Sequence, residues 1–413
     1  MTTKIVVTGL GATTPLGGTA RETWNALLAG ESGARTLEAD WVATYELPVT
    51  FAASVKVPVS EQLDRVVMKR LDPSSQYALV AGREAFADAG LGDADIDPDR
   101  LLVEWATGIG GVWTLLDAWD TLRERGPRRV LPLTVPKLMP NGPAAAIGME
   151  LNARAGARTV VSACASSTES LINAVEHLRA GVADVAITGG SEAAIHPLPL
   201  AAFASMQALS RRNDDPSHAS RPYDVDRDGF VLGEGAGALV LETEEHAKAR
   251  GARIYAEVLG GAVTADAYHI TAPDPAGSGA ARAVLDTLER SGVGRDEVRH
   301  VNAHATSTPV GDIAEYTALE AVFGDRAREI PVTATKASTG HLLGGAGAIE
   351  GMFTVLALAE GVLPPTINIE HQDDAIPLDV VTEPRPFDAK GAVAISNSFG
   401  FGGHNAVIAF RGV

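Results

Sequence analysis

The only cysteine of the chain, Cys164, stands in the segment TVVSACASSTESL, between a β-branched run and the start of a predicted helix. Its neighbours Ala163, Ala165, Ser166 and Ser167 are small, which suits a sharp strand-to-helix turn that projects one side chain. A thiol at a helix N-terminus meets unpaired backbone N–H groups and the positive end of the helix dipole, and both lower its pKa. The same N–H groups can hold an oxyanion. Cys164 is therefore a candidate nucleophile, although an inert buried cysteine is the commoner fate of a free thiol.

Three further reactive side chains follow strand-like segments. His304 lies in NAHATSTPVGD, and Lys336 and His341 lie in TKASTGHLLGGAGA, just before another predicted helix. Gly, Ser and Thr flank both histidines, a setting that does not suit a packed core imidazole, although a hydrogen-bonded structural histidine is the alternative for each one taken alone. Functional groups in open α/β sheets gather beyond the carboxyl ends of the strands. We therefore expect Cys164, His304, Lys336 and His341 to converge at one site.

The segments that must position these side chains alternate between strand and helix patterns from end to end, which indicates an α/β fold. Residues 4–11 and 101–108 are predicted strands. Residues 72–90 are a predicted helix with Ser or Asp at its start and Gly at its end, and residues 392–412 are a predicted hairpin with a Gly-rich turn.

Two pairs of segments resemble each other within the chain: 78–108 resembles 281–307, and 159–181 resembles 331–361. Both segments of the first pair have the order helix, Gly turn, acidic link and strand, and both segments of the second pair have the order strand, small-residue turn and helix. One helix of the second pair carries apolar residues at i, i+3, i+4 and i+7, namely Ile349, Met352, Phe353 and Leu356. We predict a duplicated unit with halves 1–252, which carries the cysteine, and 253–413, which carries the histidines and lysine. Chance similarity between two βα units is the alternative.

Composition narrows the class of protein. The 413 residues include 52 Asp and Glu against 34 Lys and Arg, a net charge of −18, which disfavours nucleic-acid binding. One cysteine allows no intramolecular disulfide, and no Cys/His cluster has zinc-site spacing, so no metal is expected. The N-terminus MTTKIVVTGL lacks the features of a signal peptide, and no uninterrupted apolar window of about 18 residues is present. We expect a cytoplasmic protein with no membrane association.

Taken together, the motifs resemble those of the elongating, type II β-ketoacyl-acyl carrier protein synthases, in particular the KAS II-like enzymes of actinobacteria. The resemblance covers essentially the whole chain and rests on VSACASS and on residues 220–237, 301–315, 335–348 and 396–405. It implies a thiolase-like α/β fold, with duplicated βαβαβαββ halves forming a five-layered αβαβα sandwich. Two departures are Ala305, where glycine is common, and His404, where threonine is common; both are typical of the actinobacterial members.

The resemblance implies a 3-oxoacyl-[acyl-carrier-protein] synthase, which extends an acyl chain by two carbons through decarboxylative Claisen condensation without a cofactor. Cys164 would accept the acyl chain as a thioester, and the backbone N–H groups of Cys164 and Phe401 would form the oxyanion hole. His304 and His341 would contact the malonyl thioester carbonyl; which of them acts as base and which as donor stays open.

The resemblance also implies supporting roles. A carboxylate, Glu350 or Glu315, would hold Lys336, with a purely structural ion pair as the alternative. The other implied roles are ordering of the loop behind the histidines by Asp312, hydrogen bonds to the pantetheine arm from Thr306 and Thr308, gating of the acyl pocket by Phe399 and Phe401, and lining of the acyl tunnel by Ile109.

The implied partner is acyl carrier protein, loaded with acyl or malonyl groups, and a homodimer is expected. Because acyl carrier protein is acidic, a basic docking patch is expected near the tunnel mouth. The candidates are Arg65, Lys69, Arg70, Arg128, Arg129, Arg211 and Arg212. A solvated charged face is the alternative for such residues.

Four other functions compete with this interpretation. A ketosynthase of a type II polyketide or polyene pathway has the same chemistry, and the motifs scarcely separate the two. A thiolase uses a second cysteine, which is absent here. A non-catalytic acyl-binding partner has no need of the cysteine, histidines and lysine together, and the ketosynthase-like chain-length factors lack the cysteine. A cysteine hydrolase fits two histidines and a lysine less well than decarboxylation does.

Overall fold

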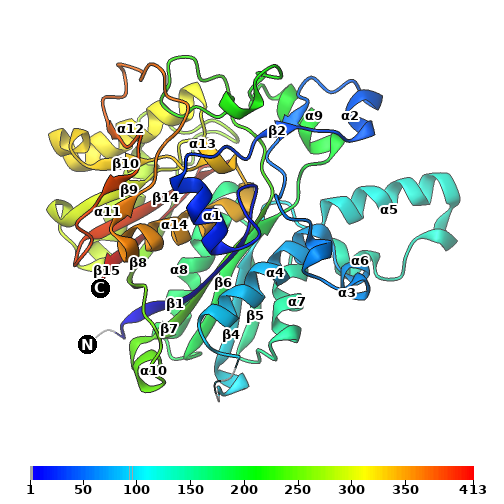
Figure 1. Ribbon diagram of the computed structural model, residues 1–413, viewed down its shortest axis with the longest axis horizontal. Helices are drawn as coiled ribbons and strands as arrows, with labels where there is room; N and C mark the ends of the chain where they lie inside the picture. The colour runs from blue at the N-terminus through cyan, green and yellow to red at the C-terminus, as the bar shows by residue number, and fades with distance from the viewer. Residues whose placement is uncertain (1–2, 93, 95) are drawn as a thin grey trace.

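A computed structural model describes residues 3–92, 94 and 96–413, and one large mixed sheet runs through it (Figure 1). The strands in order across this sheet are β12 (Asp379–Val380), β10 (Pro331–Thr333), β9 (Val298–Asn302), β14 (Val393–Gly400), β15 (His404–Gly412), β8 (Ala256–Ala265), β1 (Ile5–Thr13), β7 (Gly235–Thr243), β6 (Val185–Glu192), β4 (Leu101–Ala106) and β5 (Gly156–Val160). Two small sheets pair β2 (Arg35–Thr36) with β3 (Phe51–Ala52), and β11 (Val362–Leu363) with β13 (Arg385–Pro386).

The large sheet repeats one arrangement on either side of its centre. From β1 the order is β7, β6, β4 and β5, and from β8 it is β15, β14, β9 and β10. In both directions the first two pairings are antiparallel and the next two are parallel. The two arrangements meet where Ile5–Val7 of β1 pairs antiparallel with residues 256–258 of β8. The predicted α/β duplication is therefore visible in the sheet itself.

The helices complete five layers (Figure 1). The outer layers contain α4 (Pro73–Asp88) and α7 (Gly142–Glu150) on one side, and α11 (Ser278–Ser291) and α12 (Pro309–Phe323) on the other. The middle layer contains α8 (Ser166–Arg179) and α14 (Ala346–Glu360), each of which contacts strands of both halves of the sheet. The remaining α-helices are α1 (Ala20–Leu28), α2 (Asp40–Thr44), α3 (Arg65–Arg70), α5 (Val112–Arg125), α6 (Thr134–Leu138), α9 (Pro197–Ser205), α10 (Glu244–Ala249) and α13 (Lys336–Thr339).

Local sequence explains where several of these elements begin. Helix α4 has proline at its first position, and the Asp72 side chain accepts a hydrogen bond of 3.0 Å from the backbone N–H of Ser74. Proline and an N-capping aspartate favour a helix start because the first N–H groups of a helix have no partner within it. The predicted helix at 72–90, the strands β1 and β4, and the β14–β15 hairpin are confirmed.

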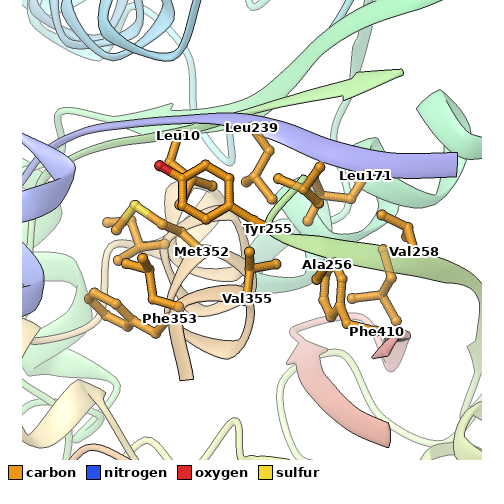
Figure 2. Packing of buried hydrophobic residues seen from close by; sticks show 14 of the residues in the cluster. Leu10, Leu171, Leu239, Tyr255, Ala256, Val258, Met352, Phe353, Val355 and Phe410 are labelled. Carbon is orange, nitrogen blue, oxygen red and sulfur yellow. The ribbon is translucent and has the colours of Figure 1, made fainter. Parts of the chain in front are cut away.

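The core helix α14 contains the four apolar positions singled out from the sequence, Ile349, Met352, Phe353 and Leu356, and all four are buried. Every other residue from Ala346 to Leu358 is buried as well, because strands and helices of both halves surround the helix. Figure 2 shows Met352, Phe353 and Val355 of α14 packed with Leu10, Leu239, Val258 and Phe410 from the strands. The stretch Leu343–Glu360 is long and apolar enough to cross a membrane, but 89% of it is buried inside the protein, as in a core helix.

Candidate active site

Cys164 lies at a tight turn between β5 and α8. A 3-10 turn, Ala163–Ala165, separates the strand from the helix, and Ala163 adopts a left-handed conformation with φ +51°. The Ser166 hydroxyl closes the turn: it donates to the Ala163 carbonyl oxygen at 2.6 Å and accepts from the Ser162 N–H at 2.8 Å. Gly400 packs against this turn, where an added Cβ would lie 2.8 Å from the Ser162 carbonyl oxygen. The small residues around Cys164 thus allow a close approach of backbone segments.

The surroundings of the thiol oppose its ionisation. Burial raises the pKa of Cys164 to about 11, while the charge of Lys336 and a hydrogen bond from the backbone N–H of Phe401 act in the opposite direction. Loss of hydration therefore outweighs the helix N-terminus, which was expected to lower the pKa of this thiol. A proton acceptor beside the sulfur is needed to form the thiolate.

His341 supplies that acceptor. Its Nε2 atom lies 3.0 Å from the Cys164 Sγ atom, and its ring meets the ring of Phe230 edge-on at 5.3 Å between centroids. Backbone hydrogen bonds hold the residue in place, since its N–H donates to the Val231 carbonyl oxygen at 2.7 Å and its carbonyl oxygen accepts from Gly233 at 2.9 Å. Burial and Lys336 hold the pKa of His341 well below its usual range, so the ring is neutral.

His304 stands at right angles to His341, with 5.4 Å between ring centroids. The Nζ atom of Lys336 lies 3.3 Å from the Nδ1 atom of His304 and donates to its carbonyl oxygen at 2.7 Å. Burial lowers the pKa of His304 well below its usual range, and Lys336 adds to this effect. Because Lys336 donates toward Nδ1, the neutral ring carries its proton on Nε2.

Lys336 forms a buried ion pair with Glu350 of α14, and burial raises the pKa of Glu350 to about 7. Of the two carboxylates expected to hold the lysine, Glu350 does so. Glu315 instead accepts hydrogen bonds from the backbone N–H groups of His304 at 3.0 Å and Ala305 at 2.8 Å. The two carboxylates thus secure different parts of the site: Glu350 holds the lysine and Glu315 holds the loop.

The loop after β9 is strained at two positions, with φ +23° at Ala305 and +68° at Ser307. Positive φ explains why glycine suits position 305 better than a residue with a side chain. Asp312 is buried behind the loop, where it accepts from the Tyr223 N–H at 3.0 Å, lies 3.5 Å from Arg227 and receives a backbone hydrogen bond from Ser307. Asp312 therefore lies between this loop and the segment of Tyr223 and Arg227, and its loop-ordering role stays a prediction.

Donor atoms of Cys164, His304 and His341 all lie within 4.8 Å of one another. By distance alone this group could hold a metal ion. The Lys336 Nζ atom, 3.3 Å from one of the rings, brings positive charge to the same place and disfavours a cation there.

These side chains open into a cavity of about 490 Å³. Besides the cysteine and both histidines, six of the site residues singled out from the sequence line this cavity: Ile109, Thr306, Thr308, Glu315, Phe399 and Phe401. Lys336 does not line it. The hydroxyls of Thr306 and Thr308 lie 3.0 Å apart. Phe399 lies 5.9 Å from His304 between ring centroids, and Gly402 and Gly403 follow Phe401 with φ +84° and +75°.

Comparison with known proteins assigns the family. Residues 2–247 match the beta-ketoacyl synthase N-terminal domain, and residues 255–370 match the beta-ketoacyl synthase C-terminal domain. The chain belongs to the beta-ketoacyl synthase family. It has the thiolase-like ketosynthase fold of that family, as the sequence predicts.

Two curated relatives of this beta-ketoacyl synthase are both named 3-oxoacyl-[acyl-carrier-protein] synthase 2. The protein of Mycobacterium tuberculosis (strain ATCC 25618 / H37Rv) is 45% identical over 98% of this chain and 96% of its own length. The protein of Synechocystis sp. (strain ATCC 27184 / PCC 6803 / Kazusa) is 44% identical over 99% of this chain and 98% of its own length. Because the two identities are nearly equal, the comparison does not single out an actinobacterial type.

Among solved structures, AntDE:AntF, a type II PKS acyl-carrier protein in complex with its ketosynthase bound to the hexaketide, is also similar. Its matching chain has a TM-score of 0.92 and 32% sequence identity, with 100% of both chains covered. The same fold therefore serves a ketosynthase of the polyketide class.

The basic residues expected to dock a carrier protein lie at the surface of this beta-ketoacyl synthase. Arg65, Lys69 and Arg70 lie on α3, Arg128 and Arg129 in the 3-10 turn Pro127–Arg129, and Arg211 and Arg212 follow α9; all are exposed except Arg212, which is half-buried. Arg211 lies near the cavity, because Gln207 lines both the cavity and a small surface pocket that includes Arg211.

Sequence reasoning missed one buried acid beside the cavity, Glu192, the last residue of β6. It also missed the aromatic wall formed by Phe203 and Phe230, whose rings meet edge-on at 5.4 Å. The local signal that could have found Glu192 is the strand-like segment VAITGGSE, which ends in a glutamate shortly after two glycines.

Proposed function

We propose that this beta-ketoacyl synthase is an elongating condensing enzyme, a 3-oxoacyl-[acyl-carrier-protein] synthase that works on acyl and malonyl groups carried by acyl carrier protein. The observation that carries the proposal is the arrangement of one thiol, two neutral imidazoles and a buried lysine around a single cavity. Such a set suits an acyl transfer followed by stabilisation of an enolate.

In the first step the Cys164 sulfur attacks the thioester carbonyl of acyl-acyl carrier protein. His341 accepts the thiol proton across 3.0 Å and passes it to the pantetheine sulfur as the carbonyl–sulfur bond breaks. The backbone N–H groups of Cys164 and Phe401 hold the transient oxyanion, which is why the placement of Phe401 N–H toward the sulfur matters. The products are acyl-Cys164 and free carrier protein.

In the second step malonyl-acyl carrier protein enters. Its thioester oxygen accepts a hydrogen bond from the Nε2–H group of His304, and a second one from His341 after the ring proton of His341 moves from Nδ1 to Nε2. The bond to the carboxylate breaks, carbon dioxide leaves, and the electron pair forms an enolate on the thioester. The enolate carbon attacks the acyl-Cys164 carbonyl, the carbon–sulfur bond breaks, and the Cys164 thiolate takes up a proton from water. Neutral imidazoles suit this step because each offers one N–H donor to the growing negative charge.

The surrounding residues position the reacting groups and bind the substrate. Lys336, held by Glu350, fixes the proton of His304 on Nε2, while Glu315 and Asp312 hold the loop that carries His304. Thr306 and Thr308 bind the pantetheine arm, Phe399 and Phe401 gate the cavity, and Ile109 faces the acyl chain.

Carrier protein and a second copy of the chain are the proposed partners. The basic residues on α3, in the 3-10 turn Pro127–Arg129 and after α9 supply the positive charge to which the acidic carrier protein docks. The homodimer is supported by the many large apolar residues that are exposed in the segment from α5 to the residue after the edge strand β5: Leu115, Trp119, Leu122, Leu131, Leu133, Val135, Met139, Met149 and Val161. A division of the chain at 252/253, a cytoplasmic location and, from Ala305 and His404, an actinobacterial lineage belong to the same proposal.

Incubation with acyl-carrier proteins of several chain lengths plus malonyl-carrier protein, followed by intact-mass analysis, tests this function. We expect an acyl adduct that is lost in Cys164→Ala, and a product longer by two carbons. Folded protein that forms neither adduct nor product contradicts the proposal.

Fatty-acid elongation is distinguished from the second candidate, a type II polyketide or polyene ketosynthase, by the substrates accepted. The 32% identity to the AntDE:AntF ketosynthase chain supports that second candidate. Turnover of saturated acyl chains favours fatty-acid elongation, and turnover restricted to poly-β-keto or polyene chains favours the second candidate.

A further inference from the structure

Glu192 is a fully buried carboxylate that receives four hydrogen bonds and no ion pair among the residues that the structure describes. Its Oε2 atom accepts from the backbone N–H groups of Gly108 at 2.7 Å and Gly344 at 3.1 Å. Its Oε1 atom accepts from the Ile109 N–H at 3.2 Å and the Thr107 hydroxyl at 3.1 Å. Three of the four donors are backbone groups, so Glu192 holds main chain in place.

The Glu192 carboxylate accepts hydrogen bonds from two segments that belong to opposite halves of the chain. Residues 107–110 follow β4 and carry Ile109, which lines the cavity, while Gly344 lies three residues after His341. The two segments touch directly: a Cβ on Gly344 would lie 2.1 Å from the Gly108 nitrogen, and a Cβ on Gly108 would lie 2.7 Å from the Glu192 Oε2 atom. Glycine at both positions permits the contact that the shared carboxylate oxygen then fixes.

The charge of Glu192 also reaches the nucleophile. Glu192 opposes ionisation of the Cys164 thiol, whose pKa is raised chiefly by burial. Burial raises the pKa of Glu192 itself to about 7, against the four hydrogen bonds that favour its charged form. The negative charge of Glu192 therefore does not help the Cys164 thiol to ionise. The role of this carboxylate rests on the hydrogen bonds that it accepts.

We propose that Glu192 is a positioning residue that clamps the acyl-pocket wall at Ile109 to the turn after His341, so that the length of acyl chain accepted and the placement of the imidazole at the sulfur are set together. The acyl-length part rests on the proposed function. The contact between the two segments and the electrostatic effect on the thiol do not depend on it.

Two substitutions separate the effect of the length of the Glu192 side chain from the effect of its charge. Glu192→Gln removes the charge and turns an NH₂ group toward backbone donors, so it loosens the clamp and relieves the charge at once. Glu192→Asp keeps the charge but shortens the side chain by one carbon, so it loosens the clamp alone. Glu234→Gln is the matched control. Glu234 is also buried and has a pKa raised to about 7, but it accepts its backbone hydrogen bond from Val55, which does not line the cavity, whereas Gly108 and Ile109, which donate to Glu192, do.

Two measurements follow on each purified protein. The first is the rate at which iodoacetamide alkylates Cys164, read by intact mass across neutral to alkaline pH; the single cysteine makes this reading unambiguous. The second is the distribution of acyl lengths transferred from acyl-carrier proteins to Cys164. For Glu192→Asp we expect the broader acyl distribution and a lower rate of alkylation at about pH 8, because the loosened turn holds His341 less well at the sulfur. For Glu192→Gln we also expect a broader distribution, but alkylation about threefold or more faster than in Glu192→Asp, because the charge that opposes ionisation of the thiol is gone.

An acyl distribution unchanged in folded Glu192→Asp overturns the clamp, and so does a Glu234→Gln variant that alters both readings as much as Glu192→Gln does. If Glu192→Gln does not fold, as judged by circular dichroism and thermal melting, Glu192→Asp decides alone. Absence of acyl transfer in the unsubstituted protein instead contradicts the proposed function; in that case the clamp is overturned if folded Glu192→Asp alkylates at the unsubstituted rate.

Discussion

The Nε2 atom of His341 lies 3.0 Å from the Sγ atom of Cys164, although 177 residues separate the two in the chain. This contact joins a turn of the first half of the sheet to a loop of the second half. It explains how a thiol with a pKa raised to about 11 by burial can still act as a nucleophile near neutral pH, because a neutral imidazole stands ready for its proton.

Replacement of His341 tests that contact. In His341→Ala we expect acyl transfer to Cys164 to slow by about 10²–10⁴-fold, the usual contribution of a positioned acid or base. Single-turnover transfer from acyl-carrier protein, followed by intact mass, measures it. His371→Ala, at an exposed histidine outside the cavity, is the control and should transfer at the normal rate. A normal rate in folded His341→Ala means that the sulfur loses its proton by another route.

Replacement of Lys336 tests whether its buried ion pair with Glu350 is needed for catalysis or only for stability. Lys336→Met leaves Glu350 as an unpaired buried carboxylate, which costs about 3–5 kcal/mol of the free energy of unfolding. The double variant Lys336→Met/Glu350→Gln removes both charges, so we expect most of that stability to return. Decarboxylation of malonyl-carrier protein should stay low in the double variant, because His304 has lost the donor to its Nδ1 atom. Condensation at the normal rate in the double variant would support the purely structural alternative.

The left-handed residue Ala163 predicts an unusual stabilising substitution. An alanine at φ +51° costs about 1–2 kcal/mol relative to a right-handed conformation, whereas glycine adopts it freely. We therefore expect Ala163→Gly to raise the free energy of unfolding by up to about 1 kcal/mol. Ala165→Gly, two residues along at φ −86°, should lower it by about 0.5–1 kcal/mol. Denaturant unfolding of both variants measures this, and equal effects of the same sign would rule out strain at Ala163.

Glu104 of β4 predicts how stability depends on pH. Burial raises its pKa to about 7, with Arg158 acting in the opposite direction. Because the folded pKa lies above the unfolded value, the proton favours the folded state. The stabilisation is fully present below the unfolded pKa and is lost as pH rises through about 7. We expect Glu104→Gln to be more stable than the unsubstituted protein at about pH 8, by about 1–3 kcal/mol, and to differ less at about pH 5.

Urea unfolding at both pH values, at one fixed protein concentration because association alters apparent stability, measures the Glu104 effect. The exposed Glu61→Gln is the control. A difference between Glu104→Gln and the unsubstituted protein that is the same at both pH values contradicts the assignment.

The exposed arginines of the 3-10 turn Pro127–Arg129 predict a loss of carrier-protein affinity. Arg128→Glu/Arg129→Glu should weaken binding of acyl carrier protein while leaving the fold intact, since both side chains are exposed. Arg299→Glu/Lys390→Glu makes the same change of charge at exposed positions that do not line the cavity. Calorimetric or surface-binding titration at two salt concentrations measures the affinity. Unchanged affinity in the first pair, or an equal loss in the second, removes Arg128 and Arg129 from the docking surface.

Much of the fold follows from local sequence. Asp72 and Pro73 mark the start of α4, and the Gly-rich turn after Phe401 marks the β14–β15 hairpin, because capping, proline geometry and positive φ act over a few residues. Apolar spacing predicted the helix α14 but not its surroundings, since every residue from Ala346 to Leu358 is buried and not only the four apolar positions. Periodicity reports one apolar face, but a helix between two half-sheets has no exposed face to report.

The sequence by itself determined which residues could do chemistry: one cysteine, two histidines in small-residue loops and a lysine, each after a predicted strand. Tertiary structure decided how they act. Only the packing of α14 shows that Glu350, not Glu315, holds Lys336, and only burial shows that the thiol pKa is raised, since hydration depends on the whole fold. Glu192 belongs to the same class, because its four donors come from two segments far apart in the chain. Residues 107–109 follow β4, which runs parallel to β6 and ends beside Glu192, and Gly344 lies in the 3-10 turn Leu343–Gly345 before α14.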